Sequence, residues 1–285
     1  MTFATVLVIL GIGTLAGLVG ALFGIGGGIL VIPALVIGFG IPMHTAVVTS
    51  LLCVIATSSA AASRNIRTGF ANVRLAMMLE PCTVTGSIAG GLVAGLLPGT
   101  TLMEIFAVTI ILMSLPMARG VPDEDDSAPD APDAAEVAEK RLTFRGGYFD
   151  PSTHSEVAYV SERVPALMGV SLFAGALRGL LGVGGGIVQV PAMTIMGRIP
   201  MKAATATSNM MIGVTAVASA IIYYGRGDVR PEIAAACVAG VFVGSRLGVQ
   251  VGSRLRGQTL RRTFAAVMVA IGVELLLKAH GIWIR

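Results

Sequence analysis

Long apolar segments alternate with short polar turns along most of this 285-residue chain. A helix needs about 20 mostly apolar residues to cross the hydrocarbon core of a bilayer. The pattern predicts helices over 2–23, 28–41, 43–63, 73–97 and 101–118, and then over 164–181, 186–198, 201–224, 231–252 and 260–283. We therefore predict an all-α polytopic membrane protein with about eight to ten membrane segments.

Two of these segments, 28–41 and 186–198, are short, and each follows a cluster of glycines. At about 1.5 Å per residue they barely reach across a core about 30 Å thick. They are predicted to be broken or half-length helices. The pattern leaves open whether they span the membrane fully or are re-entrant.

A polar interruption divides the chain into two membrane parts, 1–118 and 164–285. Residues 119–163 hold 11 of the 16 acidic residues and are rich in Pro, Ala and Asp at their start. Such a segment buries too little apolar surface to offset its ordering entropy, so we predict a soluble linker. Its later part carries aromatic and β-branched residues and is a candidate for a short ordered piece over the membrane face.

The two membrane parts are copies of one another. When the sequence is shifted by 158 residues, Gly24–Ser50 aligns with Gly182–Ser208 without gaps, and 14 of the 27 positions are identical. Repeated membrane halves that meet at a central site are a common plan of secondary transporters.

The number of crossings decides how the two copies are related. If each half crosses five times, the second is inverted, and most Lys and Arg residues fall in cytoplasmic loops, as the positive-inside rule requires. If the short segments are re-entrant, each half crosses four times and the repeats are parallel. The distribution of basic residues favours inversion.

Composition narrows the class of function. Charged residues make up 13% of the chain, against about 25% in soluble proteins, which excludes an ordinary soluble enzyme and a basic-patch nucleic-acid binder. Cys53, Cys82 and Cys237 lie far apart, without metal or redox spacing. We find no convincing nucleophile–base pair and no nucleotide-binding motif. No enzyme activity, cofactor or metal is therefore predicted.

Candidate binding residues cluster in the duplicated stretches. The glycines can turn backbone N–H groups toward an anion at a helix start, or they can simply allow tight packing. The hydroxyl and amide residues of the following helices can line a polar path or hold helices together. These candidates are Gly26, Gly27, Gly28, Thr49, Ser50, Gly184, Gly185, Gly186, Thr207, Ser208 and Asn209.

Four further residues put charge or an amide inside predicted helices. A charge at the bilayer centre costs at least about 2.5–3.5 kcal/mol, so it is usually paired or functional. Arg178 and Arg246, with Gln189, are candidates for holding an anionic substrate; a reach to lipid headgroups or an internal ion pair is the alternative. Glu80 is a candidate proton carrier, with an interfacial or paired carboxylate as the alternative.

The paired stretches GIGGGILVIPAL and GVGGGIVQVPAM, each followed by an IPM…TS pattern, resemble the TauE/SafE family of membrane permeases, the sulfite and organosulfonate exporters. The resemblance covers most of the chain outside 119–163. It implies a multi-pass transporter of the cell inner membrane that exports sulfite, sulfoacetate or a related organic anion.

We therefore expect a secondary transporter that binds a small anion near the midplane and works by alternating access. Its expected partners are that anion and the lipid bilayer, with a homodimer left open and no nucleic acid. The alternatives are a membrane-embedded enzyme or assembly factor in sulfur metabolism and a passive anion channel. The transported anion, the direction and the coupling ion are not determined by these patterns.

Overall fold

The structure is a computed structural model that describes residues 3–23, 27–67, 69–119, 144–150, 155–184, 186–252 and 257–281. In the first half the helices are α1 (Phe3–Phe23), α2 (Gly28–Phe39), α3 (Met43–Arg67), α4 (Val73–Leu96) and α5 (Gly99–Arg119). In the second half they are α6 (Val164–Leu181), α7 (Gly186–Ile195), α8 (Met201–Gly225), α9 (Pro231–Gly252) and α10 (Gly257–Ala279). The predicted helices are confirmed, including the two short ones.

Local signals explain where the helices begin and end. Asn72 caps the start of α4, where its side-chain Oδ1 accepts a hydrogen bond from the Leu75 backbone N–H at 3.0 Å. Gly40 ends α2 in the left-handed conformation, at a φ of 62°, which a glycine adopts without steric strain. Gly40 thus limits α2 to 12 residues, and α7 is shorter still, at 10 residues.

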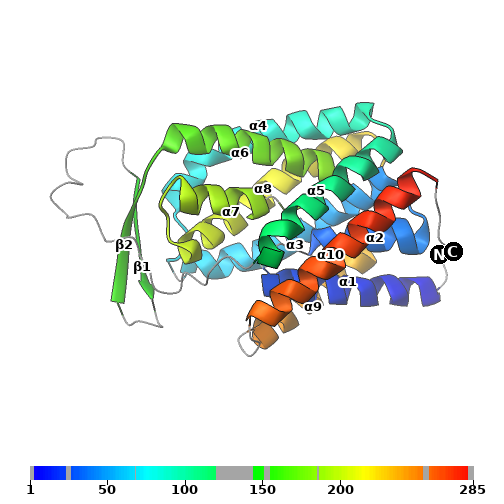
Figure 1. Ribbon diagram of the computed structural model, residues 1–285, viewed down its shortest axis with the longest axis horizontal. Helices are drawn as coiled ribbons and strands as arrows, with labels where there is room; N and C mark the ends of the chain where they lie inside the picture. Colours follow the sequence, from blue (N-terminus) through cyan, green and yellow to red (C-terminus); the bar gives the residue numbers. More distant parts are fainter. Residues whose placement is uncertain are drawn as a thin grey trace.

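The helices lie roughly along the long axis of the molecule, and its two ends differ (Figure 1). Both chain termini lie at one end, which we call the terminal end. A two-stranded antiparallel hairpin, β1 (Phe144–Asp150) and β2 (Ser155–Ser161), lies at the opposite end, which we call the hairpin end. The chain therefore starts at one end, reaches the other at its middle and returns.

The most extensive helix packing joins the two halves of the chain. Helix α1 packs on α9, α4 on α6, α3 on α8 and α5 on α10. Helices α4 and α6 touch backbone to backbone: a Cβ on Gly175 would lie 2.9 Å from the Cα of Thr83, and one on Gly179 would lie 2.8 Å from the backbone nitrogen of Gly91. Small residues that permit such approach are typical of helix interfaces in membranes.

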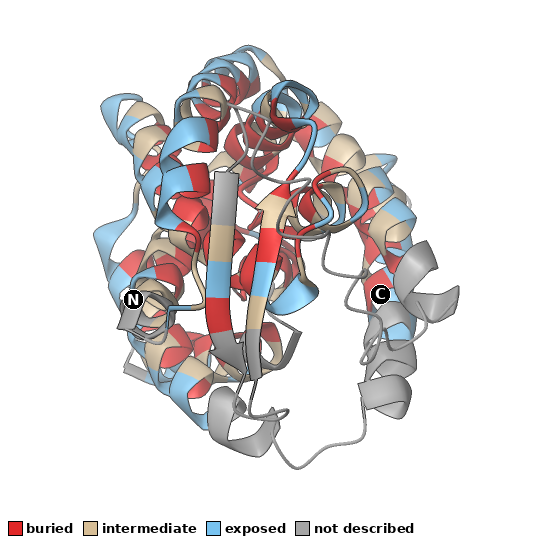
Figure 2. Cartoon of the chain, turned by 90° about the vertical axis from the view of Figure 1, so that its left-hand side faces the viewer, coloured by how far each residue is buried: buried red, intermediate tan, exposed pale blue. Residues whose placement is uncertain are grey.

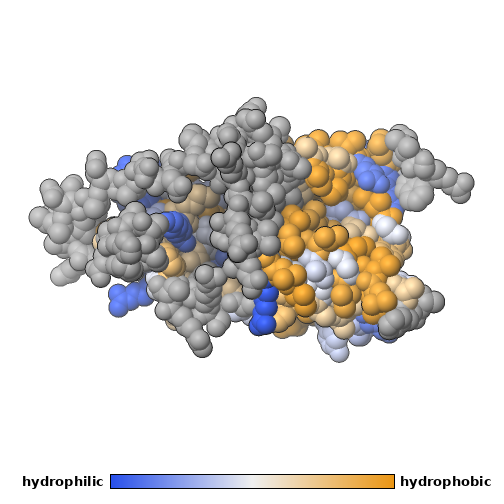
Figure 3. Space-filling view, turned by 90° about the horizontal axis from the view of Figure 1, so that it is seen from below, coloured by the Kyte–Doolittle hydropathy of each residue, from blue (hydrophilic) through white to orange (hydrophobic). Residues whose placement is uncertain are grey.

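The outer surface of the bundle is apolar, as lipid contact requires. Leu15, Met77, Leu96 and Ile221 are each at least 65% exposed, and hydrophobic residues gather on the right-hand part of the face seen in Figure 3. Among the described residues, α4, α6 and α8 are long and apolar enough to cross a membrane. The prediction of a helical membrane protein is confirmed.

The hairpin is the one departure from an all-α chain among the described residues. It stands across the end of the bundle, with buried residues on both strands (Figure 2). It forms part of the segment predicted as a linker, at the place where aromatic and β-branched residues gather. Residues 120–143 and 151–154 of that segment lie outside the described residues.

Candidate functional site

The two duplicated glycine turns lie next to each other inside the bundle. Gly27 precedes α2 at a φ of 70°, and Gly182 ends α6 at a φ of 68°. The Ser50 hydroxyl donates a hydrogen bond to the Gly182 carbonyl at 2.7 Å, and a Cβ on Gly28 would lie 3.3 Å from that same oxygen. The start of α2 therefore packs on the end of α6, and the Ser50 hydroxyl adds a hydrogen bond between the two halves of the chain.

Of the other predicted glycines, two belong to the part of the chain that the structure describes. Gly184 and Gly186 are buried, whereas Gly26 and Gly185 lie outside the described residues. The idea that backbone N–H groups here hold an anion therefore stays a prediction.

The predicted hydroxyl residues have different partners. Thr49 donates to the carbonyl of Thr45 in its own helix at 2.8 Å, so its hydroxyl is used within α3. Thr207 accepts a hydrogen bond from the Asn72 backbone N–H at 2.9 Å and links α8 to the start of α4. The buried Ser208 hydroxyl has no partner among the described residues.

Asn209 lies at a shallow groove near the start of α8. This open groove has a volume of about 380 Å³. It is lined by Phe70, Met201, Lys202, Thr205, Ala206 and Asn209.

A buried polar cluster lies between α4, α6, α7 and α8. Arg178 is 1% exposed, and its Nη2 donates to the Gln189 side-chain oxygen at 3.3 Å. The Gln189 amide nitrogen donates to the Met211 sulfur at 3.2 Å. Glu80 accepts a hydrogen bond from the Thr215 hydroxyl at 2.9 Å, and its carboxylate interacts electrostatically with Arg178. We call these five residues the Arg178 cluster.

This cluster has unused hydrogen-bonding capacity. Nε and Nη1 of Arg178 and Oε2 of Glu80 are buried and have no hydrogen-bond partner among the described residues. An unsatisfied buried polar group costs about 1–3 kcal/mol, and more when it is charged. A ligand that supplies oxygen atoms to the guanidinium would remove part of that penalty. The arrangement can therefore bind an oxyanion within the helices.

The structure does not bring Arg246 to this cluster. Arg246 is exposed on α9, and its guanidinium lies 4.5 Å from the centroid of the Phe242 ring. Such stacking is common for arginine side chains at a surface. We therefore leave Arg246 out of the site developed below.

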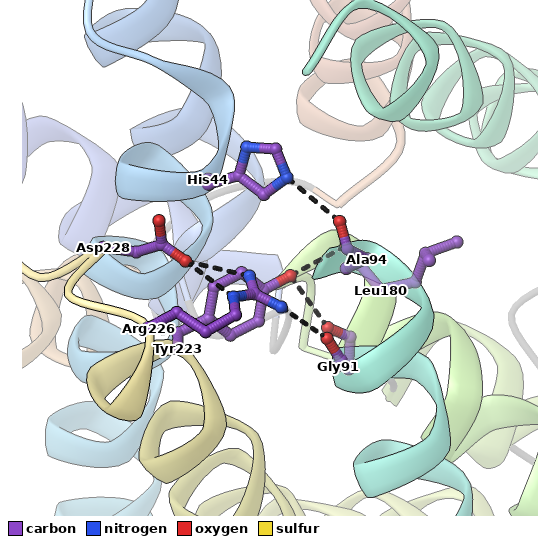
Figure 4. Close-up of polar contacts among 8 residues, drawn as sticks. His44, Gly91, Ala94, Leu180, Tyr223, Arg226 and Asp228 are labelled. Carbon is purple, nitrogen blue, oxygen red and sulfur yellow. Dashed lines mark hydrogen bonds and ion pairs between the residues drawn. The ribbon is translucent and has the colours of Figure 1, made fainter. Parts of the chain in front are cut away.

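A second polar group lies toward the terminal end (Figure 4). Arg226 donates to the Asp228 carboxylate from Nε at 3.0 Å and from Nη2 at 2.9 Å, and from Nη1 to the Gly91 carbonyl at 2.9 Å. Its guanidinium also lies 4.4 Å from the centroid of the Tyr223 ring. The Tyr223 hydroxyl donates to the Gly179 carbonyl at 3.1 Å. We call Tyr223, Arg226 and Asp228 the terminal-end lock.

The sequence interpretation missed Thr215, Met211 and the terminal-end lock. A usable signal existed for Thr215, because the 158-residue shift places it over Thr57, which belongs to a polar stripe in the first half. No comparable signal exists for Met211, whose role depends on its contact with Gln189.

The charged and amide residues of the cluster have no polar equivalents in the other repeat. The same shift places Gly20 at the position of Arg178, Val31 at that of Gln189 and Val238 at that of Glu80. Glu80 in the first half and Arg178 in the second therefore break the symmetry between the two halves. Among the described residues, no group of His, Cys, Asp and Glu side chains is arranged to hold a metal ion.

Comparisons with known proteins agree with this architecture. The family model described as "Sulfite exporter TauE/SafE" matches residues 9–275. The "Probable membrane transporter protein YunE" of Bacillus subtilis is 28% identical over 283 residues, which cover 95% of this chain and 96% of that protein. A "Probable membrane transporter protein" of Xylella fastidiosa is 25% identical, with 98% of each chain covered. No solved structure matches.

Proposed function

This chain belongs to the Sulfite exporter TauE/SafE family, and from that membership and the Arg178 cluster we propose that it is a membrane transporter that exports a small oxyanion. Sulfite or an organosulfonate such as sulfoacetate is the proposed substrate. The family name supports a sulfur oxyanion, and a guanidinium suits one because its planar donors match such oxygens.

One observation carries this proposal: a fully buried arginine with unpartnered donors inside the helix bundle. Arg178 lies on α6, one of the helices long enough to cross a membrane. A charge buried inside a membrane-spanning bundle is expensive and is usually paired or functional. Gln189 adds an amide beside the guanidinium. The buried Ser208 hydroxyl on α8 is a further unpartnered donor that we assign to the path of the anion.

We propose that the two halves are inverted repeats and that transport proceeds by alternating access between the two ends. Support comes from the course of the chain, which runs from the terminal end to the hairpin end and back (Figure 1). The positive-inside rule supports a hairpin end in the cytoplasm and a terminal end on the outer side of the cell inner membrane. The anion would pass from the hairpin end to the terminal end.

The test is counterflow in proteoliposomes that hold unlabelled sulfite inside and labelled sulfite outside, repeated with sulfoacetate and with acetate as a carboxylate control. Arg178→Lys keeps the charge but loses the planar donors, so we expect at least about a tenfold lower rate, as for a lost charged hydrogen bond. Arg246→Lys, at an exposed arginine, is the matched control and should transport like the unmodified chain.

Three results would contradict the proposed function. Equal counterflow by Arg178→Lys and Arg246→Lys would remove Arg178 from the site. Flux without stimulation by the anion on the opposite side would show a channel, and chemical conversion of the anion would show an enzyme.

We also propose that Glu80 couples transport to protons. An anion that binds Arg178 enters beside the Glu80 carboxylate, and two negative charges near one guanidinium repel each other. Protonation of Glu80 relieves this repulsion, so anion and proton would move together. Sulfite flux should respond to an imposed pH gradient in the unmodified chain and not in Glu80→Gln. An unchanged response in Glu80→Gln would exclude this role.

A further inference from the structure

The β1–β2 hairpin makes its own contribution to the core of the bundle. Tyr148 on β1 and Tyr159 on β2 are each 7% exposed, with ring centroids 6.5 Å apart. The Phe70 ring, in the turn between α3 and α4, lies 4.9 Å from that of Tyr148. The two tyrosines are therefore seated in the helix bundle, although they belong to a segment outside the repeats.

The tyrosines join an apolar cluster that reaches the Arg178 cluster. Its other buried members come from α4, α6, α7, α8 and the turn before α8. They are Leu75, Ala76, Leu79, Leu167, Met193, Ile199, Ala203, Ala204 and Met211. Because the Met211 sulfur accepts the hydrogen bond from Gln189, this apolar layer begins at the hairpin and ends at the proposed anion site.

Polar contacts hold the hairpin against the ends of the helices. The Glu162 backbone N–H, just after β2, donates to the Gly197 carbonyl at 3.1 Å, and its carboxylate lies 3.5 Å from Arg198. At the other side, a Cβ on Gly146 would lie 2.5 Å from the Tyr159 hydroxyl and 2.7 Å from the Asn72 amide nitrogen. The hairpin is thus in close contact with the turns that precede α4 and α8.

The opposite end of the same helices is closed by different chemistry. There the terminal-end lock joins the end of α8 to α4 and α6 through hydrogen bonds. The Arg178 cluster therefore lies between an apolar layer on one side and a polar lock on the other. Access from either end requires one of the two to move.

We propose that the β1–β2 hairpin is the gate at the hairpin end of the anion path, with Tyr148 and Tyr159 as its plug. The gate opens when both rings leave their seat between the helix ends. An anion in the open groove beside Phe70 then reaches the Arg178 cluster. This proposal rests on the proposed function, because a gate requires a path.

The test measures access to a reporter thiol in the full-length chain. The three native cysteines are replaced by alanine, Met211→Cys provides the reporter, and a membrane-impermeant methanethiosulfonate is added at the hairpin end. Tyr159→Ala should speed labelling at least about tenfold, because a buried ring no longer holds the gate closed. Tyr224→Ala is the matched control, since Tyr224 is 73% exposed on α8, and should change the rate less than about twofold.

Equal labelling in Tyr159→Ala and its parent would overturn the gate, as would equal acceleration by Tyr224→Ala. If Tyr159→Ala does not fold, the pair Gly146→Cys and Asn72→Cys serves instead, because a disulfide there ties the hairpin down. The rate of labelling at position 211 should then be lower in the oxidised protein than in the reduced protein, and an unchanged rate at that position would overturn the proposal. The labelling assay needs no substrate. If Tyr159→Ala speeds labelling but the unmodified chain shows no counterflow of any tested anion, only the proposed function is overturned.

Discussion

Replacing Gly175 by alanine should force α4 and α6 apart. The added Cβ would overlap the Thr83 carbonyl oxygen and lie 2.8 Å from its carbon and 2.9 Å from the Thr83 Cα. Carbon atoms pack best at about 3.5–4.0 Å, so the two helix backbones must separate by roughly 0.6–1.2 Å. Because the obstacle is backbone, no side chain can rotate away. Overpacking of this kind costs about 1–3 kcal/mol.

The control lies on the same helix. A Cβ on Gly169 of α6 would meet no atom within 4 Å, so Gly169→Ala should be neutral or stabilising by up to about 1 kcal/mol, because alanine favours helix. Thermal unfolding of the purified protein, followed by size-exclusion chromatography, measures both variants. At about 2–4 °C per kcal/mol, Gly175→Ala should lower Tm by roughly 2–12 °C. Equal Tm shifts in the two variants would refute the backbone contact.

Two further predictions concern single hydroxyl groups. Ser50→Ala leaves the buried Gly182 carbonyl without its 2.7 Å hydrogen bond and should destabilise the protein by about 1–3 kcal/mol. Ser208→Ala removes a hydroxyl without a described partner, so it should leave Tm unchanged and weaken sulfite counterflow. A lower Tm for Ser208→Ala than for Ser50→Ala would contradict this prediction. Burial raises the pKa of Tyr159, so the folded chain keeps that phenolic proton to higher pH than the unfolded chain. Its stabilising contribution is present below the ordinary pKa of about 10 and is lost as pH rises through the folded value. The phenolate absorbance of the unmodified chain minus that of Tyr159→Phe should therefore titrate above pH 10, and titration at or below it would show an exposed ring.

The helices could be predicted closely because their signals are local. Apolar run length, glycines and prolines fix the limits of each segment, and the short α2 and α7 follow the same rules. For the hairpin, the aromatic and β-branched residues predicted only a short ordered piece. Strand pairing depends on contacts that the hydrophobic pattern does not encode.

The candidate site was harder to predict because it depends on which helices meet. A charge inside an apolar segment identified Arg178, yet the same argument selected Arg246, which lies exposed beside Phe242. Helix face decides between them, and the face is set by neighbouring helices. The contact between Glu80 and Thr215 joins residues 135 positions apart, so it follows from the packing of α4 on α8 and not from any local pattern.

The pairing of helices across the two halves bears on how the chain is made. Helix α1 is synthesised first, but its most extensive partner, α9, comes from near the end of the chain. The glycine-containing face of α1 therefore stays uncovered in the lipid until translation is almost complete, and that of α4 until α6 has been synthesised. Because the most extensive helix contacts cross between the halves, we expect the folding unit to be the whole chain.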